Sequence, residues 1–402
     1  MRQIVIFTMG TRGDVQPYIY LAQALIRAGY GVAIGTHPCW ERLVADAGVS
    51  FLPIGPDVDI QREAAVIRGR SKKPMISMLR TMNFVFKIIQ SASPDIQAAC
   101  RGQDLVIVSH SQMGATEAEA LGVPIVNVTL QVEMLPQPAK PKTLGDRLFA
   151  ALVNPQMVRP YNKIRRRYQL PRVKSMDQVL SPTLNLIPIS RYVVEPSPYW
   201  GVQNHVVGYW FDDSSDYQPD DALAAFLRAG DPPLILALGA MSFESAQERD
   251  KLDLFVRAFE QTGMRALIQG FNKTLEGYPL PASMMRVGSV PHSWLFQQGY
   301  AVLHHCGFGT SAAAMLCAIP SIPIPHVLDQ FAFAQRIESL GVGVAPIKAS
   351  ELSQARVVAA IQALKARYPE LRQRAQLLAG KMRAEDGLRQ AVRLIQGVVG
   401  PA

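Results

Sequence analysis

Cysteine is scarce in this chain. Four cysteines, Cys39, Cys100, Cys306 and Cys317, are spread over 402 residues. Their spacing matches neither a disulfide framework nor a metal site, so we expect reduced thiols. Cys306 lies beside two histidines, but a lone cysteine there is more often a small packing residue than a nucleophile. Other residue types must therefore carry the chemistry.

Long apolar runs are also missing. No stretch approaches the roughly 18 consecutive apolar residues of a membrane span, and residues 1–10 lack the charged region and cleavage site of a signal peptide. We therefore expect a cytoplasmic protein. The net charge of +9 favours anionic partners. Zinc-finger spacings and aromatic-interleaved basic stripes are absent, so nucleic acid is not an expected partner.

Alternating strands and helices dominate the chain. With 49% hydrophobic residues it can fill the cores of two or three domains. Short apolar runs predict strands at residues 3–9, 31–35, 49–54, 104–109 and 125–129, and again at 234–238, 265–269, 285–288 and 301–303. Helical periodicity between them predicts an α/β protein with doubly wound parallel sheets, which bind ligands outside the carboxyl ends of their strands.

A polar, turn-rich segment at residues 212–220 separates the two series of strands. We therefore predict an N-terminal Rossmann-like domain over residues 1–215 and a C-terminal one over residues 216–402. Helices at 354–367 and 370–397 should end the chain, and we expect the last helix to pack back on the N-terminal domain. Two such domains would face each other across a cleft.

The segment from Tyr300 to Gln330 has the strongest ligand-binding pattern. A short buried strand leads to a tight turn at Gly307 and Gly309, and Thr310 then opens a helix. Unpaired N–H groups and the positive end of a helix dipole suit a phosphate or diphosphate. His304 and His305 precede the turn and offer a further donor. Asp329 and Gln330 close the segment with groups that suit sugar hydroxyls.

Two other interpretations of this segment remain. The letters GFGTSA fit a dinucleotide-binding fingerprint, with Asp329 about twenty residues on as the ribose-binding acid. That acid should end a clean strand, whereas Pro320, Pro323 and Pro325 suit a loop better. The other interpretation is a purely structural strand, turn and helix with a satisfied core histidine.

Polar residues follow several predicted strands of the N-terminal half. Asp14 comes after the first strand, His37 after the second, His110 after the fourth and Gln131 after the fifth. Because parallel strands end at one edge, all four side chains should point into one cleft. Asp14 could also simply cap the helix that starts at Val15, and a lone histidine at a strand end is often structural.

Two basic blocks, residues 56–80 and 159–174, accompany a helix rich in Met and Phe at residues 75–89. Such blocks are usually solvated helix faces. The alternative is that they rest on an anionic membrane surface or admit a greasy substrate. Methionine fills irregular apolar space, so Met75, Met78, Met82 and Met134 favour a roomy hydrophobic pocket.

With these motifs in hand, the chain resembles a glycosyltransferase of the GT-B fold, in the uridine-diphosphate-sugar-dependent superfamily. The N-terminal GTRGDVQPYIY resembles the opening motif of the branch with sterol glucosyltransferases, rhamnolipid rhamnosyltransferases and antibiotic glycosyltransferases. VPHSWLF, from Val290, resembles its nucleotide-site motif, and HHCGFGTSAAAMLCAIPSIPIPHVLDQF resembles its donor signature. These three motifs span both predicted domains.

The resemblance implies an inverting transfer in which an acceptor hydroxyl attacks the anomeric carbon of a UDP-sugar. Asp14 matches the aspartate of the family's opening motif and is the expected base, with His37 and His110 as alternatives. His305, the 307–311 backbone and the Thr310 hydroxyl would stabilise the leaving diphosphate. No Asp-x-Asp pair lies in a suitable loop, so we expect no metal, and no cofactor besides the UDP-sugar co-substrate.

The same resemblance assigns the remaining donor-site residues. Asp329 and Gln330 would hold the sugar, and glutamine at that position goes with glucose. Val290 lies where relatives offer backbone to uracil, and Trp294 borders that site or is core. The donor-binding set is therefore Met241, Ser242, Val290, Trp294, His305, Gly307, Gly309, Thr310, Ser311, Asp329 and Gln330. Ala240 replaces the usual serine, and Ala313 stands where plant relatives hold the ribose with glutamate.

For the acceptor we expect a hydrophobic hydroxyl compound such as a sterol, terpenoid, polyketide or lipid. The expected acceptor-site residues are His37, Met78, Met82, His110, Gln131 and Met134. Basic residues, including those at 165–167, would hold the pocket mouth against an anionic membrane, making the protein peripheral at its inner face. Two alternatives remain: a UDP-sugar 2-epimerase of the same fold, and a catalytically silent nucleotide-sugar-binding protein.

Overall fold

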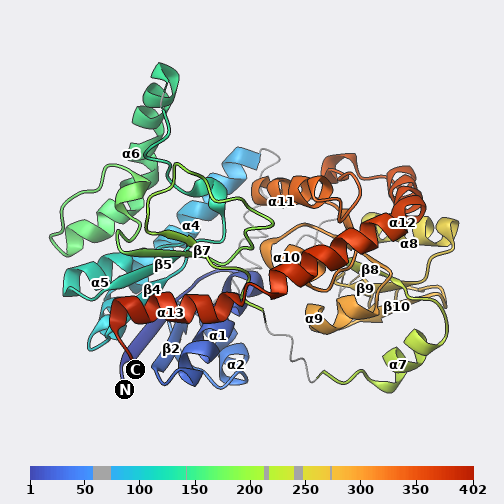
Figure 1. The fold of residues 1–402 in the computed structure, drawn as a ribbon, viewed down its shortest axis with the longest axis horizontal. Coiled ribbons are helices and arrows are strands. Elements are labelled where there is room, and N and C mark those ends of the chain that lie inside the picture. The colour runs from blue at the N-terminus through green and yellow to red at the C-terminus, as the bar shows by residue number, and fades with distance from the viewer. Residues whose placement is uncertain (58–73, 142, 212–216, 240–247, 272–273) are drawn as a thin grey trace. The chain divides into compact units, whose positions relative to one another are not determined.

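A computed structural model describes residues 1–402 except 58–73, 142, 212–216, 240–247 and 272–273. The chain divides into two compact units (Figure 1). Unit 1 comprises Met1–Trp210 and Glu385–Ala402, and unit 2 comprises Phe211–Ala384.

Unit 1 is built on a parallel sheet with the strand order β3-β2-β1-β4-β5-β6-β7. Its strands are β1 (Gln3–Phe7), β2 (Gly31–Thr36), β3 (Ser50–Pro53), β4 (Leu105–Val108), β5 (Ile125–Val128), β6 (Leu184–Ile187) and β7 (Asn204–Val206). Its helices are α1 (Arg12–Arg27), α2 (Glu41–Ala45), α4 (Pro74–Cys100), α5 (Ala115–Leu121), α6 (Leu144–Arg167) and α13 (Gly387–Val399). The strand order reverses between β1 and β4, which is where such sheets bind ligands.

Helices cover both faces of the unit 1 sheet, because its central strands are apolar on both sides. Val5, Phe7, Val106 and Val108 pack against α4 and α5 in one core. Side chains alternate along a strand, so Ile4 and Ile6, also buried, face the other layer. In that layer α1 packs on β2 and on α13, and α13 also contacts β6.

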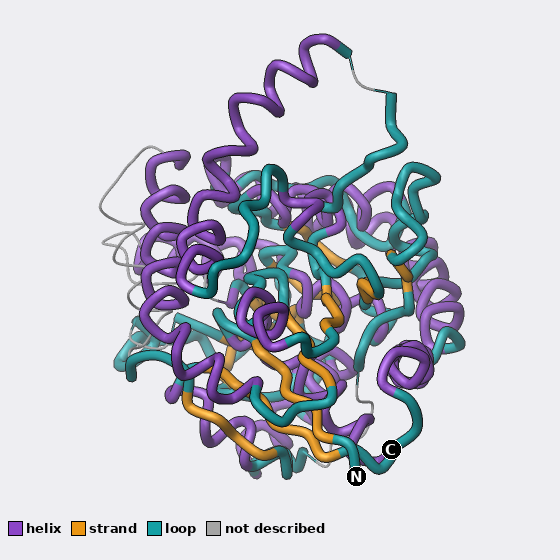
Figure 2. The backbone as a smooth tube through the Cα atoms, turned by 90° about the vertical axis from the view of Figure 1, so that its left-hand side faces the viewer, coloured by secondary structure: helices purple, strands orange, loops and turns teal. Residues whose placement is uncertain are grey.

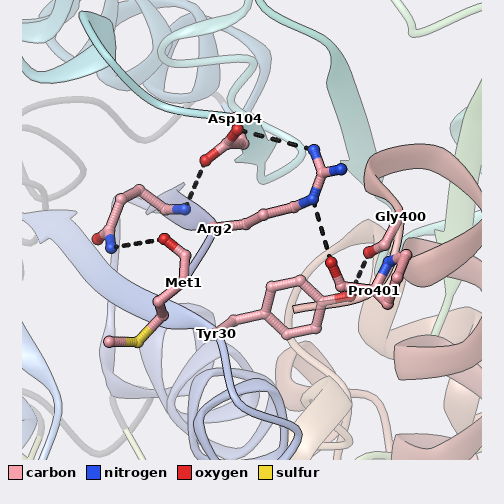
Figure 3. A network of polar contacts seen from close by, with 7 residues as sticks. Met1, Arg2, Tyr30, Asp104, Gly400 and Pro401 are labelled. Atoms are coloured by element: carbon pink, nitrogen blue, oxygen red, sulfur yellow. Dashed lines mark hydrogen bonds and ion pairs between the residues drawn. The ribbon is translucent and has the colours of Figure 1, made fainter.

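The two chain ends lie side by side in unit 1 (Figures 1 and 2). Figure 3 shows how they are joined: Arg2 Nε donates to the Pro401 carbonyl at 3.1 Å, and the Tyr30 hydroxyl donates to the Gly400 carbonyl at 2.6 Å. Asp104 accepts from the Gln3 amide at 2.7 Å and pairs with Arg2 at 3.8 Å. The last helix is therefore held by both its packing face and its end.

Unit 2 has a parallel sheet with the order β10-β9-β8-β11-β12. Its strands are β8 (Leu234–Ala237), β9 (Ala266–Gln269), β10 (Met284–Val287), β11 (Ala301–His304) and β12 (Ser321–Pro323). Its helices are α7 (Asp221–Arg228), α8 (Glu248–Thr262), α9 (His292–Leu295), α10 (Phe308–Leu316), α11 (Leu328–Ser339) and α12 (Gln354–Arg383). One core joins β8, β9, β11, α8 and α12.

The predicted α/β class is confirmed, and all nine predicted strands are present. β6, β7 and β12 were not predicted. β12 ends on Pro323 and lies at the sheet edge, where a missing N–H is tolerated. Buried Asn185 interrupts the apolar pattern of β6. Its Oδ1 accepts a hydrogen bond from the Thr129 hydroxyl, after β5, at 2.9 Å, and its Nδ2 donates to Asn204 Oδ1, on β7, at 2.7 Å.

The end of the chain differs from the prediction. α12 runs through Pro369 without a break. Pro369 and Lys365, whose carbonyl loses its helical partner, are both exposed residues, which keeps the cost of the missing hydrogen bond low. Leu364 and Leu371 are fully buried on either side of it and pack the helix on the core. The break comes instead before Asp386, which has φ +49° and caps α13.

The basic block at the end of α6 also differs from the expectation. Arg165 is buried, and its guanidinium makes a two-pronged ion pair with Glu119 of α5 at 2.5 and 2.8 Å. Arg165 therefore joins two helices and is unavailable to a membrane, because its charge is already desolvated and paired. Its neighbours Arg166 and Arg167 are exposed. The basic residues at 62, 68, 70, 72 and 73 lie outside the described residues.

Candidate active site

The carboxyl ends of four adjacent strands carry the residues predicted for the N-terminal cleft. In the order β2, β1, β4 and β5, these strands are followed by His37, Asp14, His110 and Gln131. All four residues therefore share one edge of the unit 1 sheet, on both sides of the point where its strand order reverses.

Asp14 is the third residue of α1 and folds back over the preceding turn. The Thr11 amide and the Thr11 hydroxyl both donate to Asp14 Oδ2, at 2.7 and 2.9 Å. A Cβ at Gly10, which has φ +136°, would overlap this carboxylate, so glycine is needed there. Oδ1 receives no hydrogen bond from the described part of the chain. One oxygen is thus held in place while the other remains able to accept a proton.

Tyr18 lies one helical turn after Asp14 and was not among the predicted site residues. It is fully buried, and its pKa is raised well above 10, first by burial and then by the negative charge of Asp14. The hydroxyl of Ser109, at the end of β4, partly opposes the shift. The phenol of Tyr18 therefore stays protonated beside the Asp14 carboxylate. In the sequence, only the i, i+4 spacing of the two residues indicated that they are neighbours.

The two histidines at this edge differ. His37 is fully buried, neither ring nitrogen has a hydrogen-bond partner among the described residues, and burial lowers its pKa to about 4. It is therefore neutral at pH 7. His110 and Gln131 are both half-buried. His110 Nδ1 is buried and has no hydrogen-bond partner among the described residues. The side chains of Met75, Met78, Met82 and Met134 lie outside what the structure describes.

In unit 2 the predicted histidine pair at the end of β11 divides into two roles. His304 is fully buried, with Nε2 3.0 Å from the Ser321 hydroxyl and Nδ1 accepting from the Cys306 amide at 3.2 Å. Burial, followed by the nearby His305 and His292, lowers its pKa to about 3. It is a satisfied core histidine. Cys306 is fully buried with φ +62°, and burial raises the pKa of its thiol.

His305 instead lies against two glycines. Its Cε1 would be 2.9 Å from a Cβ at Gly239, after β8, and its Nε2 would overlap a Cβ at Gly307. Burial lowers the pKa of His305 to about 4, with the Ala237 main chain opposing the shift. The imidazole is therefore neutral at pH 7. Because Gly239 and Gly307 have no Cβ, the ring fits between them.

The helix that follows the turn is α10, which starts at Phe308, two residues before the predicted start. Gly307 caps it, and the first hydrogen bond to Gly307 O comes from Ser311 N at 2.9 Å. The amides of Phe308, Gly309 and Thr310 thus precede the helical hydrogen-bond ladder. Thr310 and Ser311 are buried, and Ser311 Oγ has no partner among the described residues. This end of the helix is a candidate cradle for an anion.

Asp329 and Gln330 lie in the first turn of α11. Gln330 is 5% exposed, and its Oε1 accepts from the amides of His326 and Val327 at 2.8 and 3.3 Å. This glutamine therefore caps α11, while its NH2 group makes no hydrogen bond within the described residues. Asp329 is half-buried.

His326 was not among the predicted residues. Its Nδ1 is 2.8 Å from the Ile324 carbonyl, which makes Nδ1 the donor. Burial, then the charge of Lys251, then His305 lower its pKa to about 4. His326 is therefore a second neutral imidazole close to His305. Its position directly after Pro325 in the donor segment was the only sequence signal.

The predicted nucleotide-site motif forms a loop held by Gln269, at the end of β9. Gln269 Nε2 donates to the carbonyls of Gly288 and Val290 at 3.1 and 2.9 Å, and its Oε1 is 2.8 Å from His292 Nε2. Val290 is buried, and its amide donates to Gly288. Trp294 packs edge-on against Tyr217 at 5.0 Å. Gln269 was not predicted, and Met241 and Ser242 lie outside the described residues.

Within those residues, no three His, Cys, Asp or Glu side chains gather as metal ligands. The described helices also include none that is long and apolar enough to cross a membrane.

Two parallel α/β units, one with a carboxylate at its strand ends and one with a glycine turn before a helix, define the GT-B class of glycosyltransferases. Solved structures agree. A calicheamicin glycosyltransferase, CalG4, matches with a TM-score of 0.76 at 18% identity, covering 100% of this chain and 98% of that one. The glycosyltransferase VinC, solved in complex with DTDP, matches with a TM-score of 0.71 at 20% identity over the full length of both.

Family models match both halves of the chain. Residues 4–136 match the glycosyltransferase family 28 N-terminal domain, and residues 272–393 match the erythromycin biosynthesis protein CIII-like C-terminal domain. Each half of the chain is therefore similar to a domain found in glycosyltransferases.

Curated relatives carry related names. A sterol 3-beta-glucosyltransferase of Arabidopsis thaliana is 29% identical over 97% of this chain and 67% of its own length. One from Leptosphaeria maculans is 31% identical over 85% of this chain. The O-mycaminosyltylonolide 6-deoxyallosyltransferase of Streptomyces fradiae is 28% identical over 98% of this chain and 97% of its own. The chain spans about two thirds of the plant enzymes and about a quarter of the fungal one.

Proposed function

We propose that this protein transfers glucose from UDP-glucose to a hydroxyl of a hydrophobic acceptor, with inversion at the anomeric carbon and without a metal ion. The observation that carries the proposal is the carboxylate of Asp14, with one oxygen held by Thr11 and the other without a hydrogen bond from the described residues. A base so positioned can accept the proton of an attacking hydroxyl.

Asp14 is the base in this mechanism. The two Thr11 bonds fix the side-chain rotamer, so that the free oxygen keeps one direction while a hydroxyl approaches. Tyr18 stays neutral beside it and adds no competing negative charge. As the acceptor oxygen bonds to the anomeric carbon, its proton passes to Asp14 and the bond to the diphosphate breaks on the opposite face.

The leaving diphosphate gains one negative charge on the oxygen released from the sugar, and the donor unit must stabilise it. The first amides of α10 and the buried hydroxyls of Thr310 and Ser311 offer hydrogen bonds, supported by the helix dipole. His305 is neutral at pH 7, so it acts as a hydrogen-bond donor and not as a cation. The free NH2 group of Gln330 and the carboxylate of Asp329 hold the glucose hydroxyls.

A sterol or a macrolide is the acceptor class we favour. The proposal rests on relatives named for sterols and for a tylonolide, and on the methionine-rich sequence at the start of α4. We also propose a peripheral membrane contact through α6, where Leu144 and Leu152 are each 75% exposed and Arg159 and Arg166 are exposed further along. Arg165 takes no part in it.

Asp14→Asn tests the base. It keeps the shape and an oxygen for the Thr11 bonds but removes proton acceptance, so turnover of UDP-glucose with a sterol or macrolide panel should fall roughly 100-fold. UDP affinity, measured by calorimetry, should stay unchanged. NMR of the product should show the inverted anomer, and chelator treatment should leave the rate unaltered.

The chain offers a matched control. Asp146 occupies the same helix position in α6, where it accepts from the Thr143 amide and hydroxyl at 2.9 and 2.7 Å. Asp146→Asn therefore makes the same capping change on an exposed helix and should leave turnover unaltered. Normal turnover in Asp14→Asn would overturn the assignment, and variants of His37 and His110 would then be compared.

A further inference from the structure

A cavity of about 470 Å³ lies in unit 1 beside the edge strand β7, and it shares no lining residue with the site around Asp14. Its walls come from three segments: the loop before β7, the edge strand β7 and the helix α13, whose positions Figure 1 shows. The polar residues in these walls are Arg191, Asn204, His205, Gln390 and Arg393. No step of the proposed reaction uses them.

The two arginines offer unused donors to this cavity. Arg393 is exposed and makes no ion pair or hydrogen bond with the described residues. Arg191 Nε is 3.5 Å from Glu385 Oε1. The two terminal nitrogens of Arg191 make no hydrogen bond with the described residues. Two guanidinium groups from separate elements thus border one cavity.

Nearby carboxylates only partly offset this charge. Glu385 is 6% exposed and its Oε1 also accepts from the Arg191 amide at 3.0 Å, so it is turned toward the backbone. Asp386 pairs with Arg389 at 2.6 Å, on the turn of α13 before Arg393. Neither acid contributes to the cavity wall. The residues that form the walls therefore include two positively charged side chains and no carboxylate.

We propose that this cavity binds a phosphate ester. Guanidinium groups recognise phosphate oxygens with strong, charge-assisted hydrogen bonds, and His205 supplies a further polar contact. Pro196, Val207 and Leu394 form the apolar part of the wall, which suits the carbon skeleton attached to the phosphate. The volume exceeds what a bare phosphate needs. The ester is a soluble sugar or glycerol phosphate, or the headgroup of an anionic lipid.

Binding to the full chain distinguishes these sources. Calorimetry with glycerol 3-phosphate tests the soluble ester, and co-sedimentation with vesicles of phosphatidylglycerol and phosphatidylcholine, against phosphatidylcholine alone, tests the headgroup. Arg393→Gln should weaken binding of the relevant probe roughly tenfold, the effect of losing one charge-assisted hydrogen bond. Arg191→Gln is the second variant, made on a different element.

Arg389→Gln is the matched control, because it removes the same charge from the same helix but outside the cavity. It should leave the affinity unchanged. A phosphate ester can also occupy the donor site in unit 2, but that binding would not respond to Arg393. The proposal is overturned if neither probe binds, or if Arg389→Gln and Arg393→Gln weaken binding equally.

Discussion

Asp14 and Asp146 show how far a single residue's role depends on its surroundings. Both are third residues of a helix, and both accept from the amide and hydroxyl of a threonine three positions earlier. Local energetics cannot separate them, because each makes the same capping contacts. Asp14, however, is half-buried at the strand ends of a sheet beside Tyr18, whereas Asp146 lies on an exposed helix start.

Gln330 has two separable functions, and one substitution distinguishes them. Gln330→Glu keeps the oxygen that accepts from His326 and Val327, so α11 should remain capped and the melting temperature near wild type. It removes the NH2 group proposed to hold glucose. The kcat/KM for UDP-glucose should therefore fall roughly tenfold while UDP affinity, measured by calorimetry, is unaltered.

Gln330→Ala is the companion variant, since it removes the cap as well. Its stability should drop by about 1 kcal/mol in addition to the loss of sugar binding. Unchanged donor kinetics in Gln330→Glu would show that this residue is a helix cap alone.

At the scale of elements, the turn before α10 depends on two glycines with different surroundings. Gly307→Ala should lower the melting temperature and weaken UDP binding, because the new Cβ overlaps His305 Nε2 and must displace the ring. Gly309→Ala is the control for the fold: no atom of the described residues lies within 4 Å of its added Cβ, and alanine is the better helix former by roughly 0.5–1 kcal/mol. Differential scanning fluorimetry without ligand compares the two.

The ligand-free measurement is what makes this pair informative. Gly309→Ala should melt at or above the wild-type temperature and Gly307→Ala below it. Equal melting temperatures would mean that His305 moves aside without cost, and the turn would then not hold the imidazole in place.

At the scale of the whole molecule, buried neutral histidines make stability depend on pH. Burial lowers the pKa of His37, His305 and His326 to about 4 and that of His304 to about 3. In the unfolded chain each titrates near 6.5. Between these pH values the unfolded state binds more protons than the folded state. The free energy of unfolding should therefore be highest above pH 6.5 and fall as the pH drops toward 4.

Each such histidine contributes a slope of about 1.4 kcal/mol per pH unit in that window. His37 is the residue to change, because its ring nitrogens have no partner among the described residues. His37→Leu should reduce the loss of thermal stability between pH 6.5 and 4.5, and His205→Gln, at a half-exposed position, should not. A pH dependence identical to wild type in His37→Leu would contradict the neutral state of His37.

Much of the fold could be predicted because its signals are local. Runs such as residues 105–108 are apolar over the length of a strand, and the glycine turn before α10 follows from the residues that form it. β6 escaped prediction because buried Asn185 breaks its apolar run, and its partners Thr129 and Asn204 are distant in the sequence. The predicted break between residues 367 and 370 is absent, because Pro369 is exposed and the helix continues through it.

The sequence by itself determined which chemical groups follow which strand: the carboxylate after β1, the imidazoles before the glycine turn, and the amide at the start of α11. Only the tertiary structure decided which of them are used internally. His304 is hydrogen-bonded to Ser321, whereas His305 lies against two glycines, and Arg165 forms an ion pair with Glu119. The physical reason is that burial and hydrogen-bond partners come from elements remote in the chain, and these set whether a side chain is neutral, paired or free to act.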